Sequence, residues 1–104
     1  MYVRVTTVRM KAGTEEHAAR IWQDDVGPRL RALQGFRAVY AAFDRATHET
    51  VAIVCYDSEA AARAVMDSGE YGRILARFGD VLEGQPTPRG YDVLYHTTPD
   101  APPG

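Results

Sequence analysis

The order in which strand-like and helix-like segments alternate along the chain limits the folds that it can adopt. Four segments are rich in β-branched and aromatic side chains, which is typical of strands. They are residues 2–10, 36–44, 50–57 and 91–97. Over residues 18–33, apolar side chains recur every three or four positions, as on one face of a helix. A second helical stripe occupies residues 60–82, with a break at 67–69. The predicted order is therefore strand, helix, strand, strand, helix, strand.

Glycine and proline mark the ends and breaks of these segments. Pro28 removes a backbone donor inside the first helical stripe, so a kink or a restart of the helix is expected there. Gly35 is expected to end that helix. The polar link at residues 45–49 is short enough to join its two flanking strands as an antiparallel hairpin. Residues 84–89 contain two prolines and are predicted to form a loop before the last strand.

Two strand–helix–strand units with right-handed crossovers build a single sheet. The predicted fold is therefore α+β and ferredoxin-like, with the order βαββαβ, a four-stranded antiparallel sheet and both helices on one face. A chain of 104 residues has room for one such domain, which we assign to residues 1–97. Residues 98–104 have the composition of a flexible C-terminal tail.

Both faces of the predicted sheet are apolar, although the helices can cover only one of them. The residues taken to face the helices are Val3, Val5, Ile53 and Cys55. The opposite face then contains Arg4, Thr6, Val8, Ala52, Val54 and Tyr56. A face of this kind is too apolar to remain in contact with water. We therefore predict that a second copy of the chain covers it and that the protein is a homodimer.

Composition and charge argue against several kinds of partner. Twelve basic against fourteen acidic side chains give a net charge of −2, without the basic excess that nucleic-acid binding requires. No apolar run approaches the roughly 18 residues of a membrane span, and the start does not resemble a secretory signal, so we expect a cytoplasmic protein without a membrane partner. The single cysteine, Cys55, and three histidines that are not three or four residues apart predict no metal site.

Several short motifs are shared with one known family. They are Lys-Ala-Gly at residues 11–13, the break at Pro28, Gly-Phe at residues 35–36 and Tyr-Asp-Ser-Glu at residues 56–59. Together with the order of elements, they make the sequence over about residues 1–96 resemble the antibiotic biosynthesis monooxygenase-like family of dimeric α+β barrels. The resemblance implies a homodimer whose two sheets pack face to face, with a pocket between each sheet and its helices or within the barrel.

Members of this family that degrade haem use an asparagine in the first strand, a tryptophan at the end of the third strand and a histidine in the second helix. The corresponding positions here are Thr6, Tyr56 and the segment 60–82, which contains no histidine. Without that axial ligand, haem degradation is not expected, and no cofactor is predicted. The resemblance instead implies a cofactor-independent monooxygenase, or a cyclase or isomerase, that acts on an aromatic or polyketide-like small molecule.

Few residues are available for such chemistry. The candidates for lining a ligand pocket are Thr6, Arg37, Tyr40, Tyr56 and Tyr95. Tyr56 and His96 are the candidates for a catalytic role, because a phenol or an imidazole can hold or move a proton beside a ligand. The tyrosines are equally explained as ordinary strand residues, since aromatic side chains are favoured in strands.

Two alternatives stay open at this point. Arg4 and Arg37 either pair with a carboxylate or an anionic ligand between the sheets, or lie solvated at a sheet edge. The protein is either an enzyme of the kind described above or a non-catalytic dimeric barrel that binds a small hydrophobic ligand or serves as a stress-response module. Fold analogy favours the enzyme, whereas the missing family residues favour the non-catalytic module.

Overall fold

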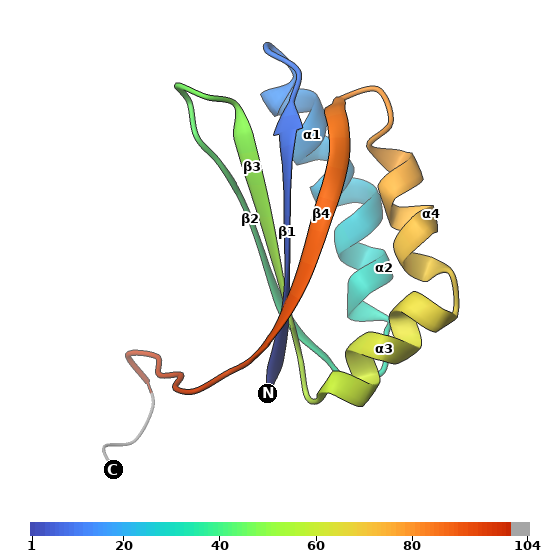
Figure 1. Cartoon of the computed structure of the whole chain (residues 1–104), viewed down its shortest axis with the longest axis vertical. Coiled ribbons are helices and arrows are strands. Elements are labelled where there is room, and N and C mark those ends of the chain that lie inside the picture. Colours follow the sequence, from blue (N-terminus) through green and yellow to red (C-terminus); the bar gives the residue numbers. More distant parts are fainter. Residues whose placement is uncertain (101–104) are drawn as a thin grey trace.

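The computed structural model describes residues 1–100; residues 101–104, which belong to the predicted tail 98–104, lie outside the described residues. The elements are β1 (Tyr2–Met10), α1 (Glu15–Ile21), η1 (Trp22–Val26), α2 (Gly27–Arg31), β2 (Phe36–Phe43), β3 (Glu49–Tyr56), α3 (Glu59–Asp67), α4 (Glu70–Arg77) and β4 (Leu82–Asp92). The strands form one antiparallel sheet in the order β2-β3-β1-β4, and the helices cover one of its faces (Figure 1). The predicted fold class is confirmed. Within residues 1–100, no helix is long and apolar enough to cross a membrane.

The break predicted at Pro28 takes the form of a π-helical turn between two α-helical segments. Pro28 has no backbone N–H, so the ordinary helical hydrogen bond to the carbonyl four residues earlier cannot form. The chain widens instead, and the Gly27 N–H donates to the carbonyl of Trp22, five residues back. A Cβ at Gly27 would lie 2.7 Å from that carbonyl oxygen, so glycine is required at this turn. The π-turn thereby sets the position of Trp22 relative to the sheet.

The last strand differs from the prediction. Residues 84–89, predicted to be a loop, belong to β4 (Leu82–Asp92), and residues 93–97 of the strand predicted at 91–97 form neither strand nor helix. β4 is an edge strand, so a proline there deprives no second neighbour of a hydrogen bond. Pro88 stands opposite Thr6 on β1, and the register shifts between Thr7 and Arg9, where β4 contributes extra residues as a bulge. The two prolines in residues 84–89 are therefore compatible with an edge strand and do not mark a loop.

The two predicted sets of alternating strand residues are present, but their faces are exchanged. The set that includes Thr6, Ala52 and Tyr56 faces the helices, and the set that includes Val5 and Ile53 faces away. The assignment of Arg4, Val8 and Val54 to the open face is therefore wrong, as is that of Val3 and Cys55 to the helix-covered face. Hydrophobicity could not distinguish the faces because both sets are apolar. The two sets differ in size at the middle of the sheet, where the helix-facing Thr6 and Ala52 are smaller than Val5 and Ile53 on the other face.

Two clusters of buried side chains hold the helices on the sheet. One cluster lies at the Met10 end of β1 and contains Phe78 and Val81 from the chain around the end of α4. The other lies at the opposite end of the sheet, where Tyr56 packs against Ala62 and Val65 of α3. Burying apolar side chains of this kind supplies most of the stability of a small domain.

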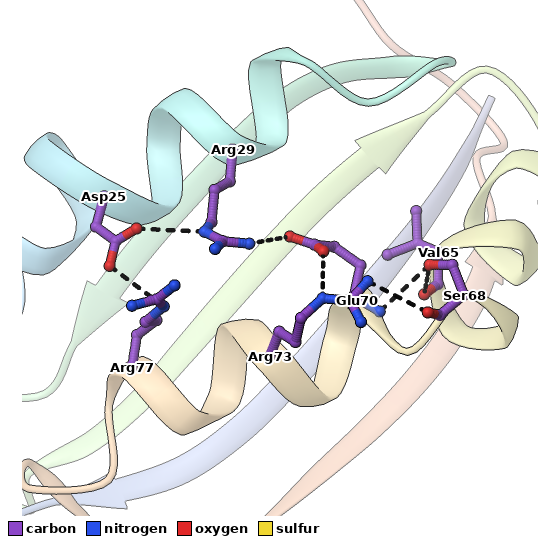
Figure 2. A network of polar contacts seen from close by, with 7 residues as sticks. All are labelled: Asp25, Arg29, Val65, Ser68, Glu70, Arg73 and Arg77. Atoms are coloured by element: carbon purple, nitrogen blue, oxygen red, sulfur yellow. Dashed lines mark hydrogen bonds and ion pairs between the residues drawn. The ribbon is translucent and has the colours of Figure 1, made fainter.

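A network of ion pairs joins the outer surfaces of the helices (Figure 2). The Arg29 guanidinium lies 3.3 Å from the Asp25 carboxylate and 2.7 Å from the Glu70 carboxylate, and it thereby connects η1 and α2 with α4. Arg73 binds Glu70 at 2.9 Å, and Arg77 approaches Asp25 at 3.4 Å. Hydrogen bonds from Arg73 and Arg29 hold the pKa of Glu70 below its ordinary value of 4.5. The ionised Glu70 carboxylate therefore stabilises the fold fully at pH values above 4.5, and this stabilisation is lost as the pH falls through the lowered pKa.

Candidate functional site

A cavity of about 250 Å³ lies between the helix-covered face of the sheet and the helices. Its floor is formed by residues of β1 and β3, among them Thr6, Val8, Ala52 and Val54. Its roof is formed by residues of α1, η1 and α4, among them Ala18, Trp22, Tyr71, Ile74 and Leu75. Nearly all of these side chains are apolar. A cavity of about 150 Å³ already accommodates benzene, so this one has room for a larger aromatic molecule.

The cavity exists because small side chains meet in the middle of the sheet. Thr6 stands opposite Ala52, and Ala52 stands opposite Ala41, so three small residues form a row across β1, β3 and β2. The distance between the helices and the sheet is set by the larger side chains that pack at the two ends of their interface. Side chains as short as alanine and threonine cannot reach across that distance. The space above them remains unfilled by the protein.

The cavity opens at the edge strand β2. A second, more open hollow of about 320 Å³ lies there and shares Ala19, Trp22 and Ala41 with the cavity. Ala19 and Ala41 are both exposed, and the nearby Phe43 is 40% exposed although its ring is apolar. The shared residues place the side of the cavity nearest to solvent between α1 and β2.

Trp22 of η1 and Phe78 at the end of α4 contact each other in the roof of the cavity. Their ring centroids are 5.1 Å apart and their planes are inclined at 45°, a tilted arrangement that is favourable for aromatic pairs. Both side chains line the cavity. An aromatic ligand in the cavity could therefore pack against the rings of both Trp22 and Phe78.

Tyr71 lines the cavity and has a buried hydroxyl group. The hydroxyl oxygen is inaccessible to solvent and has no hydrogen-bond partner within residues 1–100. Burying a hydroxyl without a partner is unfavourable by roughly 1–3 kcal/mol in proteins. A ligand with a carbonyl or hydroxyl oxygen at this position would remove that cost. The sequence analysis counted Tyr71 among the apolar residues of a helix and did not predict it as a site residue. The signal that could have identified it was a polar hydroxyl in a helical stripe otherwise made of Ile74, Leu75 and Phe78.

The charged residues of the cavity lie at its two ends. Arg4, half-buried, lies on the floor near the start of β1. Glu15 lies at the other end, where its carboxylate oxygen is 3.7 Å from the Nδ1 atom of His48 in the β2–β3 hairpin. Thr50, also at that end, uses its hydroxyl to donate a 2.6 Å hydrogen bond to the Val8 carbonyl. Among the described lining residues, Glu15 is the one carboxylate that could accept a proton from a ligand.

The other predicted site residues lie in several places. Thr6 lines the cavity. Tyr40 lies on the open face of the sheet and is 66% exposed. Tyr95 is 79% exposed, and His96 is also exposed, in the segment after β4. Within a single chain, the structure does not bring Tyr40, Tyr95 or His96 to the cavity.

The sequence left open whether Arg4 and Arg37 lie between the sheets or solvated at a sheet edge. Arg37 follows the second alternative, whereas Arg4 follows neither, because it lies between the sheet and the helices. Arg37 lies exposed on the edge strand β2, where its guanidinium pairs with the Asp57 carboxylate at 2.9 Å. Arg4 lies on the central strand β1 and faces the cavity. Arg37 is thus a solvated edge residue, and Arg4 is the arginine that a ligand can reach.

Tyr56 is a packing residue rather than part of the cavity wall. It is 4% exposed and packs against Tyr2, Ala62 and Val65. The prediction that its ring lies on the face away from the helices is wrong, because that set of alternating residues faces them. Burial raises the pKa of the Tyr56 phenol, with an opposing contribution from Arg4, so this group stays neutral at ordinary pH and is no proton acceptor.

No metal-binding cluster accompanies the cavity. Within residues 1–100, no group of three or more His, Cys, Asp or Glu side chains is arranged to hold a metal ion. The Cys55 thiol lies on the opposite face of the sheet, and burial raises its pKa. The polar groups that line the cavity include the Arg4 guanidinium, the Glu15 carboxylate and the side chains of Thr6, Thr50 and Tyr71.

An antiparallel sheet with helices on one face and an apolar cavity between the two layers defines the class of protein. Comparisons with protein-family models and with curated proteins each found no match. Solved structures do match, beginning with a monooxygenase from the gene ActVA-Orf6 of Streptomyces coelicolor in complex with nanaomycin D. Its TM-score is 0.75 at 18% identity, over 95% of this chain and 92% of that chain.

Two further structures support the same assignment. A protein of unknown function from Nitrosomonas europaea, NE2512, has a TM-score of 0.72 at 17% identity, over 96% of this chain and 95% of that chain. A structure named as an antibiotic biosynthesis monooxygenase has a TM-score of 0.68 at 14% identity, over 91% of this chain and 100% of that chain. The chain has the fold of antibiotic biosynthesis monooxygenase-like proteins, as the resemblance in sequence implied.

The packing of Tyr56 leads to a stability prediction. Tyr56→Ala should lower the free energy of unfolding by about 3–5 kcal/mol, because it leaves a hole between β3 and α3. Tyr56→Phe keeps the ring and should cost about 1 kcal/mol or less. Urea denaturation at a fixed protein concentration measures both, with the exposed Tyr95→Ala as the control. A cost below about 1 kcal/mol for Tyr56→Ala would mean that the ring borders open space.

Proposed function

We propose that the cavity between the sheet and the helices binds a small, flat, apolar molecule, and that the protein oxygenates this molecule without a cofactor. The observation that supports binding most strongly is the apolar cavity itself, one of whose lining residues, Tyr71, has a buried hydroxyl without a partner. A ligand oxygen would supply that partner. The structural neighbour from Streptomyces coelicolor, which is a monooxygenase in complex with nanaomycin D, favours oxygenation as the reaction.

Oxygenation without a cofactor requires the substrate to supply the electrons. An anthrone-like phenol can do so: its methylene carbon loses four electrons and becomes a carbonyl, one atom of O₂ enters the product and the other leaves as water. The protein then needs an apolar site, a hydrogen-bond donor for the substrate oxygen and an acceptor for the first proton. The cavity walls, the Tyr71 hydroxyl and the Glu15 carboxylate would fill these roles.

A second function, ligand binding without catalysis, is favoured by one specific observation. The titratable side chains among the described lining residues are Arg4, Glu15 and Tyr71, and Glu15 lies at an end of the cavity next to His48 rather than at its centre. Incubation with anthrone and measurement of oxygen uptake separates the two functions. Enzyme-dependent uptake with quinone formation supports the monooxygenase, whereas tight binding without uptake supports the binding module.

Filling the cavity should abolish binding without unfolding the protein. Ala52→Phe places a ring in the middle of the floor, where it replaces empty space. We expect the affinity for phenylnaphthylamine, a neutral fluorescent dye, to fall at least tenfold, while the free energy of unfolding stays equal or rises. Ala64→Phe, on the exposed side of α3, is the matched control and should bind like the unmodified protein. Unchanged binding by Ala52→Phe would contradict the proposed site.

We also propose that the protein is a homodimer and that the open face of the sheet forms the interface. This face contains Val3, Val5, Val51 and Ile53, and at its margins lie Tyr40 and Tyr91, which are 66% and 49% exposed. An apolar sheet face is self-complementary across a two-fold axis, so a second copy is the occupant that fits it. A permanent interface of this type buries about 2,000 Å² or more.

The dimer should depend on the centre of the open face. Ile53→Asp places a charge there and should shift the protein from dimer to monomer or to unfolded chain at micromolar concentration. Ala64→Asp adds the same charge on the exposed side of α3 and should leave the dimer intact. Sedimentation equilibrium measures the mass of each variant. A mass equal to one chain for the unmodified protein at micromolar concentration would disprove the dimer.

A further inference from the structure

We propose that the ligand of the cavity carries an anionic group, such as a carboxylate, a sulfonate or a phenolate, and that the Arg4 guanidinium binds it. This inference rests on the proposed function, since it assumes that the cavity is a binding site, and it adds the charge and the orientation of the ligand. It also names a specificity-determining residue that the family resemblance does not provide.

Arg4 occupies an unusual place for a charged side chain. It lies on β1, a central strand, between Val54 of β3 and Gly90 of β4, and its side chain faces the helices rather than the open face. It is half-buried and lines an otherwise apolar cavity. A guanidinium in such a place loses part of its hydration, which is unfavourable unless another group replaces the water.

The protein does not supply a carboxylate for Arg4. Within residues 1–100, no carboxylate lies within 4.0 Å of its guanidinium, whereas five other arginines have such a partner. These are Arg29, Arg37, Arg63, Arg73 and Arg77. The aromatic neighbour of Arg4 is Tyr2, whose ring centroid is 6.0 Å from the guanidinium carbon, at the outer limit of a cation–π interaction. The arginine that faces the cavity is thus left with its donors free for a ligand.

Nearby groups do not neutralise this charge. Tyr56 lies close enough for Arg4 to influence its titration, but burial keeps the phenol in its neutral form. The charged group at the other end of the cavity is Glu15, near the end of β1 where Val8 pairs with Thr50. Val8 is four positions beyond Arg4 along β1, which corresponds to about 13 Å. An anionic ligand would therefore place its charge at Arg4, away from the Glu15 carboxylate, and its apolar rings along Thr6 and Ala52.

Two fluorescent dyes with the same aromatic body test this inference on the full-length protein. Phenylnaphthylamine is neutral, and anilinonaphthalene sulfonate adds one sulfonate to the same ring system. We expect the sulfonate dye to bind at least tenfold more tightly than the neutral dye, because a charge-assisted hydrogen bond contributes about that factor. Arg4→Gln should remove this preference and leave the affinity for the neutral dye unchanged. Arg4→Lys should retain part of the preference.

The controls separate failure of this inference from failure of the proposed function. Arg63→Gln removes an exposed arginine of α3 and should change neither affinity. Ala52→Phe should abolish the binding of both dyes; if it does not, the dyes bind outside the cavity and the proposed binding site is wrong. If Ala52→Phe abolishes binding but the two dyes bind the unmodified protein equally, or Arg4→Gln leaves the preference intact, the cavity is a binding site and the role of Arg4 is disproved.

Discussion

The packing mismatch between the middle of the sheet and the helices above it is the constraint on which the rest of the structure depends. Large side chains fill the interface at both ends, with Met10 and Phe78 at one end and Tyr56 at the other. Between them, Thr6, Ala52 and Ala41 present only short side chains. Because packed interiors do not deform continuously, the helices stay at the distance that their ends require. The result is a cavity rather than a collapsed core.

Other features of the chain keep this arrangement open. The ion pairs from Arg29 to Asp25 and to Glu70 connect η1 and α2 with α4 (Figure 2). Glu70 is only 13% exposed in its side chain, so this link is better shielded from solvent than an ordinary surface ion pair. The π-turn at Gly27 holds Trp22 over the cavity, and π-turns of this kind often occur at functional sites. The ion pairs and the π-turn therefore both hold the helices in the positions that leave the cavity open.

The sequence predicted the order of the elements, the hairpin and the break at Pro28, because each depends on local chemistry. Periodicity also separated the strand residues into the correct alternating sets. It could not assign those sets to faces, since Val5 and Ile53 are as apolar as Val8 and Val54 and the helices select a face through three-dimensional packing. Tyr56 was consequently expected on the open face, but it lies on the helix-covered face, where it packs against α3 at one end of the sheet instead of lining the cavity. The size difference between Ala52 and Ile53 was the signal that could have corrected it.

The prolines of β4 and the phenol of Tyr71 show two further limits of sequence reasoning. Proline is read as a loop former unless the strand is known to be at an edge, and strand order is a property of the whole sheet. Tyr71 lies on a helix among apolar residues, and only the packed structure shows that its hydroxyl lacks a partner. Arg4 illustrates the same limit, because only the packed structure shows that its side chain faces the helices and lines the cavity.

The central claim is that a small molecule binds between the sheet and the helices, and not on the open face where two sheets would meet. Methyl NMR of the full-length protein with bound naphthol measures this most directly, through nuclear Overhauser contacts between ligand protons and assigned methyl groups. The account predicts contacts to Val54, Ile74 and Leu75, which line the cavity. Contacts to Val3, Val5 and Ile53 in their place would locate the ligand on the opposite face and contradict the account.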